Sequence, residues 1–210
     1  MEMLNEKILI ENGASLLELP KKKIIFSEGN EPLYYYQIKS GKVKMYSELD
    51  NGTEFIQGVF CCNDSFGEAA LFGNFNYPSS AMTMENSEIW KLKKNIFFDI
   101  IKNNFEIHRK FDTILSYKLQ YKSMLLKDIM SSDSENRILS LIIYFKNVSL
   151  RKNEQTISIK GRKYYKFPFS RNELANMVGL RLETVIRYVK ILEKKGKLSI
   201  INRKIYCIID

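Results

Sequence analysis

The sequence is poor in the residues on which most cofactor and metal sites depend. It contains one histidine, His108, and three cysteines, Cys61, Cys62 and Cys207, in 210 residues. An iron–sulfur cluster usually requires four cysteines, and a haem requires axial ligands that a single histidine near the start of a helix does not provide. An odd number of cysteines, two of them adjacent, does not describe a disulfide framework. We therefore expect no metal site, no iron–sulfur cluster and no haem.

Long apolar runs and catalytic motifs are also missing. No run approaches the roughly 20 apolar residues that a membrane-spanning helix needs. The first residues, MEMLNEKILIENG, carry early acids instead of the basic and then apolar order of a signal peptide. These features predict a cytoplasmic protein without membrane contact. The sequence has no phosphate-binding loop of the G-x-x-x-x-G-K-[ST] type, and its one histidine leaves little from which to build a nucleophile–base pair. We therefore expect that the chain is not an enzyme.

Acidic residues are scarce at one end of the chain. From Lys160 to the C-terminus there are 13 Lys and Arg residues against four Asp and Glu residues, which accounts for the whole net charge of +9. The preceding part is neutral. Such an asymmetry indicates a module that binds a polyanion, joined to a module with another task. The alternative is a basic surface that is only solvated.

Short strands are predicted for the first 100 residues. Segments rich in β-branched and aromatic residues alternate with turn signals such as Ser40-Gly41 and Asp50-Asn51-Gly52. The expected strands are 23–26, 34–39, 42–46, 54–60 and 85–92. A spacing of about 8 to 12 residues per strand favours a β-barrel or jelly roll over βαβ units.

A helical period replaces the strand pattern after about residue 95. A short helix is expected at 97–101, followed by a long helix from Ile107 that carries two apolar rows. The first row comprises Ile107, Phe111, Ile114, Tyr121 and Leu125, and the second comprises Leu115, Leu119, Lys122, Leu126 and Ile129. Two rows indicate burial on two sides, against the barrel of the same chain and against a partner helix. We assign the first row to a dimer interface; the alternative is a helix packed inside a monomer.

A Ser/Asp cluster at 130–134 should end the long helix and cap the next one, expected at 135–145. We place a domain boundary there. The prediction is an α+β protein with a β domain at 1–104, a long helix at 105–132 that carries the expected dimer interface, and a basic, polyanion-binding domain at 133–210.

The segment SRNELANMVGLRLETVIRYVKILEKKGKL predicts two helices joined by a tight turn. Ser170 and Glu173 have the spacing of a capping box at the start of the first helix. Gly179 provides the left-handed residue that ends it. The second helix has an apolar face of Val185, Val189 and Leu192. This is the helix-turn-helix arrangement, in which the second helix enters the major groove of DNA.

The polar face of the second helix has the chemistry for reading bases. Arg187 can donate two parallel hydrogen bonds to guanine, and Glu183 can accept one from cytosine. The two residues are four apart, so they share a face and could alternatively form an ion pair with each other. A wing of two strands, 197–201 and 204–209, follows, and the basic turn at Asn202-Arg203 suits phosphate contact.

Three segments together resemble the Crp/Fnr family of bacterial transcription regulators: FSEGNEPLYYYQIKSGKVKMYSELDNGTE, FGEAALF and the helix-turn-helix segment above. The resemblance implies a cyclic-nucleotide-binding-like jelly roll, a long dimerisation helix and a C-terminal winged helix-turn-helix. It also implies a homodimer on an inverted-repeat operator, with double-stranded DNA and RNA polymerase as partners. Glu183 and Arg187 match the family's base-contacting residues. Arg181 departs from the family, which often has Ser or Thr there, so the helix cap is weaker or Arg181 contacts a base.

The resemblance also assigns phosphate contacts and an effector pocket. The residues matching Arg171 and Thr184 touch phosphates in the family. We expect the full set of phosphate contacts to be Ser170, Arg171, Thr184, Lys190, Arg203 and Lys204. We expect the pocket to comprise Gly67, Glu68, Ala69, Ser79, Ser80, Ala81 and Ser123.

The pocket residues argue against a cyclic nucleotide. Gly67 and Glu68 match the family's ribose-binding pair, but Ser79 stands where cyclic-AMP-binding members have the arginine that neutralises the phosphate. Residues 66–83 contain no Lys, Arg or His, so Glu68 would leave the site negative. We expect an uncharged small molecule in a pocket rich in aromatic residues (Phe66, Phe72, Phe75, Tyr77 and 34–36). The alternatives are a cyclic nucleotide bound without that arginine, or no effector, with the aromatic residues filling the barrel.

Overall fold

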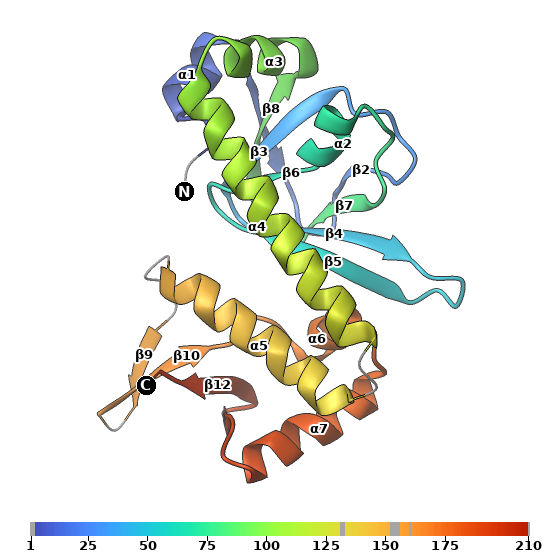
Figure 1. Ribbon diagram of the computed structural model, residues 1–210, viewed down its shortest axis with the longest axis vertical. Helices are drawn as coiled ribbons and strands as arrows, with labels where there is room; N and C mark the ends of the chain where they lie inside the picture. Colours follow the sequence, from blue (N-terminus) through green and yellow to red (C-terminus); the bar gives the residue numbers. More distant parts are fainter. Residues whose placement is uncertain (1–2, 131–132, 152–155, 160, 210) are drawn as a thin grey trace. The chain divides into compact units, whose positions relative to one another are not determined.

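The computed structural model describes residues 3–130, 133–151, 156–159 and 161–209 (Figure 1). The chain forms two compact units, Met1–Gln120 and Tyr121–Asp210. The long helix α4 (Phe105–Met130) contributes residues to both units. The domain limits at residues 104 and 132 stay predictions.

The first unit contains two four-stranded antiparallel sheets. The first sheet has the order β1-β8-β3-β6 and consists of β1 (Ser15–Leu19), β8 (Ser87–Lys93), β3 (Tyr34–Ser40) and β6 (Ser65–Phe66). The second has the order β2-β7-β4-β5 and consists of β2 (Ile24–Phe26), β7 (Ser80–Thr83), β4 (Val43–Glu48) and β5 (Glu54–Phe60). The helices are α1 (Glu6–Glu11), α2 (Glu68–Gly73), α3 (Lys94–Lys102) and the first part of α4. The jelly-roll prediction is confirmed.

Two hydrophobic clusters fill this unit, because side chains alternate between the two faces of strand β3. Tyr36 joins a cluster drawn from both sheets, in which the rings of Phe26 and Tyr77 stack with their centroids 3.6 Å apart. Tyr35 joins the other cluster, where it stacks on Phe97 of α3. The aromatic residues of the predicted pocket are therefore divided between two cores.

The second unit contains α5 (Ser134–Arg151), α6 (Arg171–Val178), α7 (Leu182–Lys194) and a four-stranded sheet. The sheet has the order β11-β12-β10-β9 and consists of β11 (Ser199–Ile201), β12 (Lys204–Ile208), β10 (Arg162–Lys166) and β9 (Thr156–Ile159). Asp133 caps α5 by accepting a hydrogen bond from the Glu135 backbone at 2.9 Å. Arg137 of α5 donates to the Asp128 and Ile129 carbonyl oxygens and so satisfies the end of α4. This unit is the predicted winged helix.

Candidate nucleic-acid interface and effector site

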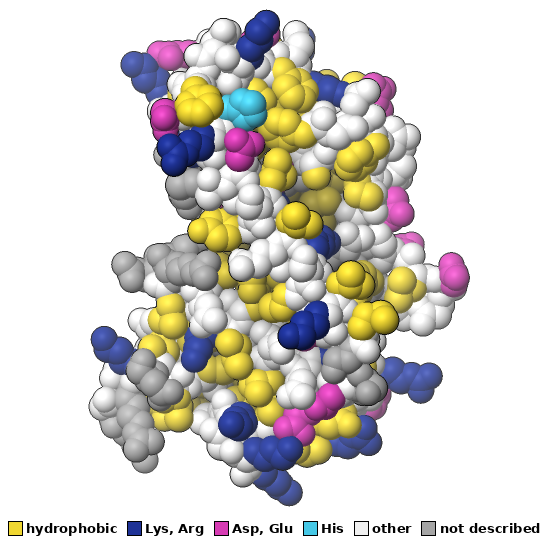
Figure 2. Space-filling model, viewed as in Figure 1, with side chains coloured by type: hydrophobic (Ala, Val, Ile, Leu, Met, Phe, Trp, Pro, Cys, Tyr) yellow, Lys and Arg dark blue, Asp and Glu magenta, His cyan; other side chains and the backbone are white. Residues whose placement is uncertain are grey.

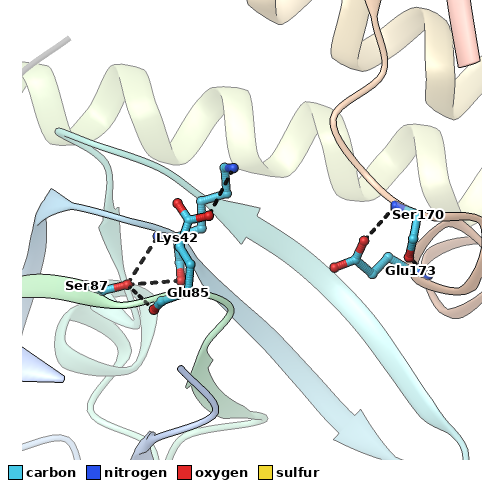
Figure 3. A network of polar contacts seen from close by, with 5 residues as sticks. All are labelled: Lys42, Glu85, Ser87, Ser170 and Glu173. Atoms are coloured by element: carbon cyan, nitrogen blue, oxygen red, sulfur yellow. Dashed lines mark hydrogen bonds and ion pairs between the residues drawn. The ribbon is translucent and has the colours of Figure 1, made fainter. Parts of the chain in front are cut away.

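The helix-turn-helix begins with a complete capping box. The Glu173 backbone donates to Ser170 Oγ at 3.2 Å, and the Ser170 backbone donates to Glu173 Oε2 at 2.7 Å (Figure 3). Gly179 ends α6 in the left-handed region with a φ of 65°, a conformation that glycine adopts without strain. These two features, both predicted, set where α6 begins and where it ends.

Helix α7 divides into a buried face and an exposed face. Val185, Val189 and Leu192 have no exposed surface and fix the helix to its domain. Glu183 and Arg187 are exposed on the other side. No side chain caps the start of the helix at Arg181, in agreement with the weak cap predicted for an arginine at this position.

The two predicted base-reading residues are not engaged with each other. Within the described residues no ion pair joins Glu183 to Arg187. The Arg187 guanidinium lies over the Tyr188 ring, 5.1 Å from its centroid. An open groove of about 450 Å³ follows this side of the helix. Its lining residues are Glu183, Ile186, Arg187, Lys190, Ile191 and Lys194. The sequence predictions do not include Ile186 or Ile191, although their positions relative to Glu183 and Arg187 fit the same helical stripe.

The wing tip is tied to the start of α6. Asn202 and Arg203, between β11 and β12, have positive φ values of 48° and 62°. Arg171 Nη1 donates to the Arg203 carbonyl oxygen at 3.1 Å. Arg203 and Lys204 are exposed, as is Lys190 on α7, and Thr184 is half-buried. In Figure 2, Lys and Arg side chains gather over α7, where Figure 1 draws it at the bottom of the view.

The first apolar row of α4 is buried within the chain's own units. Ile107 and Phe111 belong to the core of the first unit, with Ile114 packed against it. Tyr121 and Leu125 are buried too, and Tyr121 packs on Tyr144 with the ring centroids 4.6 Å apart. These side chains, assigned above to a dimer interface, are therefore covered by the chain itself.

The second row of α4 is the exposed one. Leu119 is 68% exposed, Leu126 63% and Ile129 42%, and hydrophobic side chains line the face of α4 seen in Figure 2. Large apolar side chains at this exposure, repeated along one helical face, are typical of an interaction surface.

The predicted effector residues are placed as follows. Gly67 has a φ of 76° and packs so closely on Phe26 that a Cβ atom would lie 2.9 Å from its ring. Ser79 and Ala81 are buried, Ser80 Oγ accepts from the Glu28 backbone at 3.0 Å, and Ala69 is exposed. Ser123 is exposed on the part of α4 that belongs to the second unit. Phe75, from the predicted aromatic set, is 47% exposed.

Glu68 has a partner that the sequence predictions do not include. Its side chain is 1% exposed, and Oε1 accepts from Lys118 Nζ of α4. Lys118 also donates to the Ser65 carbonyl oxygen at 2.9 Å, and its ammonium group lies 4.7 Å from the centroid of the Phe60 ring. The charge of Glu68 is therefore balanced, which corrects the expectation of a negative site. Glu68 Oε2 and Ser79 Oγ have no hydrogen-bond partner within the described residues.

Two of the cysteines, Cys62 and Cys207, differ in exposure and in their surroundings. Cys62 is exposed and its thiol donates to the Lys39 carbonyl oxygen at 3.0 Å. Burial raises the pKa of the Cys207 thiol to about 11, which makes that residue a poor nucleophile. No group of three or more potential metal ligands occurs among the residues that the structure describes. None of the helices described is long and apolar enough to cross a membrane.

Comparison with known proteins assigns both units. Residues 16–104 match the family model of the cyclic nucleotide-binding domain, and residues 136–210 match that of the Crp-like helix-turn-helix domain. The anaerobic regulatory protein of Aggregatibacter actinomycetemcomitans is 23% identical over 182 residues, which is 87% of this chain and 68% of the relative. The fumarate and nitrate reduction regulatory protein of Escherichia coli (strain K12) is also 23% identical, over 87% of this chain and 70% of its own.

The fold is shared with solved structures. A CooA mutant from Carboxydothermus hydrogenoformans superposes with a TM-score of 0.79 at 17% identity, covering 100% of this chain and 92% of that one. The cyclic nucleotide-binding domain comes first and the Crp-like helix-turn-helix domain second, and both match this chain. The chain therefore belongs to the Crp/Fnr family of DNA-binding transcription regulators.

Proposed function

We propose that the chain binds an inverted-repeat operator in double-stranded DNA as a homodimer, with α7 of each protomer in the major groove of one half-site. The observation that carries the proposal is the exposure of Glu183 and Arg187 on one face of α7, without an ion pair between them. Arg187 suits guanine and Glu183 suits cytosine. Arg181, exposed at the start of the helix, is the third proposed base contact.

Phosphate contacts would surround this face. Arg171 and Arg203 are joined by a hydrogen bond, so the start of α6 and the wing tip present their positive charges together. Ser170, Thr184, Lys190 and Lys204 complete the proposed set. Contacts of this kind set the register of a protein on DNA without reading its sequence.

Replacing Arg187 with alanine should weaken binding to the preferred operator by about 1–3 kcal/mol and relax the preference at one base pair of each half-site. Gel-shift titrations against a panel of half-site variants would measure this. Lys204→Ala is the control, because loss of a phosphate contact should weaken all sequences alike and lower the salt dependence. Equal losses on every sequence for Arg187→Ala would contradict base reading, and a wild-type protein indifferent to sequence would contradict the proposed function.

The exposed row of α4 supports the homodimer. Leu115, Leu119, Lys122, Leu126 and Ile129 follow the alternating steps of four and three of a coiled-coil seam. We propose that this row, rather than the buried one, contacts the same row of a second copy. RNA polymerase is the proposed protein partner of the DNA-bound dimer.

For the first unit we propose an effector other than a cyclic nucleotide. The segment 66–83 has no cation, and Lys118, the cation that Glu68 contacts, is already held by Glu68 and the Ser65 carbonyl oxygen. A second candidate is a regulator without a small-molecule effector. The stacked rings of Phe26, Tyr36, Phe66 and Tyr77 between the sheets favour it.

Cyclic AMP and cyclic GMP should not stabilise the protein. A ligand at one hundred times its Kd would add about 2.7 kcal/mol to the free energy of unfolding, which thermal unfolding detects as a shift of several degrees. We expect no saturable shift at millimolar nucleotide. Linear AMP at equal ionic strength is the control, because the basic second unit can attract any anion. A shift specific to a cyclic nucleotide would show that the pocket accepts the phosphate without the family's arginine.

A further inference from the structure

A polar pair continues the exposed row of α4 towards the N-terminus of the helix. His108 and Asp112 are exposed, and they precede Leu115 and Leu119 at successive steps of four, three and four residues. At about 100° per residue, both side chains project within about 20° of Leu119. The surface proposed to contact a second copy therefore carries an imidazole and a carboxylate at its N-terminal end.

These two side chains are placed to bind one ion together. His108 Nε2 lies 3.9 Å from Asp112 Oδ1, which is too far for a hydrogen bond. Within the described part of the chain, neither side chain forms a hydrogen bond or another ion pair. Residues four apart lie on one helical face, and this is the spacing at which the two histidines of the H-E-x-x-H motif bind zinc.

One chain supplies only two of the ligands that such a site needs. Zinc usually has four ligands, and no three possible ligands gather anywhere in the described ranges. A dimer on one inverted repeat has both DNA-binding units at the same end, so its two copies of α4 run in parallel. In a parallel pair each residue of the seam faces its own copy. His108 and Asp112 of both protomers therefore meet at the twofold axis.

We propose that His108 and Asp112 of the two protomers bind one divalent metal cation of the zinc class at the twofold axis of the dimer. The proposal rests on the proposed function, because the site is incomplete without the second copy. Two imidazole nitrogens and two carboxylate oxygens suit tetrahedral zinc, whereas magnesium and calcium prefer oxygen ligands alone. The cation also offsets the repulsion between two facing carboxylates. The site replaces the expectation of no metal site, which follows from the ligands of a single chain.

Zinc should strengthen the dimer of the full chain. A monomer has two of the four ligands and binds the ion weakly, so zinc at one hundred times its Kd for the dimer should lower the dimer dissociation constant by about a hundredfold. Sedimentation equilibrium of chelator-treated protein, with and without zinc, would measure this change. Equilibrium dialysis should find one zinc ion for every two chains. Magnesium at the same concentration is the control and should have no effect.

Two substitutions at these exposed positions separate metal binding from a structural role. His108→Ala should abolish the response of the dimer to zinc. Asp112→Asn should abolish it too, but its metal-free dimer should be more stable than that of the wild type, because two facing carboxylates are removed. Cys61→Ser/Cys62→Ser is the matched control, since thiolates are the other zinc ligands that the chain offers. This variant should bind zinc and respond to it as the wild type does.

Three results would overturn the inference while leaving the proposed function intact. One is a dimer whose dissociation constant does not change with zinc. Another is a zinc response that His108→Ala retains, or that the double cysteine variant loses. The third is a metal-free Asp112→Asn dimer no more stable than the wild type, because the carboxylates would then not face each other. A wild-type protein that is monomeric with and without zinc would overturn the proposed homodimer and this inference together.

Discussion

Replacing Leu126 with glutamate should dissociate the dimer and lower operator affinity by about a hundredfold. Leu126 is 63% exposed in the single chain and is flanked by Lys122 and Ile129 in the exposed row of α4. A twofold axis brings each substitution into the interface twice. If each desolvated carboxylate costs about 1.4 kcal/mol or more, two of them account for this loss. Sedimentation equilibrium would measure the dimer, and gel shifts the affinity.

The control for Leu126→Glu is Lys127→Glu. It places a carboxylate one residue further along α4, at an exposed position outside the row, and changes the net charge by more than Leu126→Glu does. A coiled-coil seam predicts that Lys127→Glu remains dimeric. An unchanged dimer in Leu126→Glu, or equal dissociation in both variants, would contradict the assignment of this row to the interface.

The sequence predicts the helix-turn-helix closely, because its signals are local. Ser170, Glu173 and Gly179 determine the ends of α6 through their own backbone and cap geometry, and the structure contains all three features. The apolar spacing of Val185, Val189 and Leu192 gives the buried face of α7. The exposed positions of Glu183 and Arg187 follow from that face by helix geometry alone.

The first unit was harder to predict because its elements are short. Strand β7 (Ser80–Thr83) consists of SAMT, which has weak β-propensity, and it forms because β4 and β2 flank it. Helix α2 (Glu68–Gly73) is only six residues long. Both lie in the segment 66–83, which reads as a loop when its neighbours in space are unknown.

The periodicity of the sequence predicts two apolar rows on α4. It does not predict which of the two rows is buried against the rest of the same chain. Each row contains one lysine, Lys118 in the first and Lys122 in the second, so only the partner of the lysine distinguishes the rows. Lys118 lies four residues after Ile114 and three before Tyr121, which places it on the face of the first row. A lysine on this buried face requires a partner for its ammonium group. Glu68, a lone acid in a segment without cations, is that partner. Two unmatched charges distant in sequence thus indicate the face of α4 that packs on the β domain.

Replacing Lys118 with methionine should destabilise the first unit by about 3–5 kcal/mol, the cost of removing one partner from a buried ion pair. Glu68 is 1% exposed, and without Lys118 its carboxylate has no counter-ion to offset desolvation. Urea unfolding followed by the fluorescence of Trp90 would measure the loss. Trp90, the single tryptophan of the sequence, lies in β8 of this unit.

Lys44→Met is the matched control for Lys118→Met. Lys44 forms an ion pair with Glu54 and lies 4.6 Å from the centroid of the Tyr46 ring, so the two lysines have the same kinds of partner. The difference is burial of the acid, since the Glu54 side chain is 30% exposed and keeps contact with water, whereas Glu68 is 1% exposed; Lys44 itself is 13% exposed and Lys118 30%. Loss of the Lys44–Glu54 ion pair should therefore lower the free energy of unfolding by about 1 kcal/mol or less. Equal losses in the two variants would show that burial of Glu68 does not determine the effect.

The double variant Glu68→Gln/Lys118→Met separates the ion pair from the packing around it. Removing both charges leaves no unpaired carboxylate, so the double variant should recover most of the stability that Lys118→Met loses. If it does not recover, the aliphatic part of Lys118 and its contact with Phe60 carry the stability instead. Recovery would show that Lys118 serves chiefly as the counter-ion of Glu68. A positively charged effector that bound Glu68 would have to displace the Lys118 ammonium group.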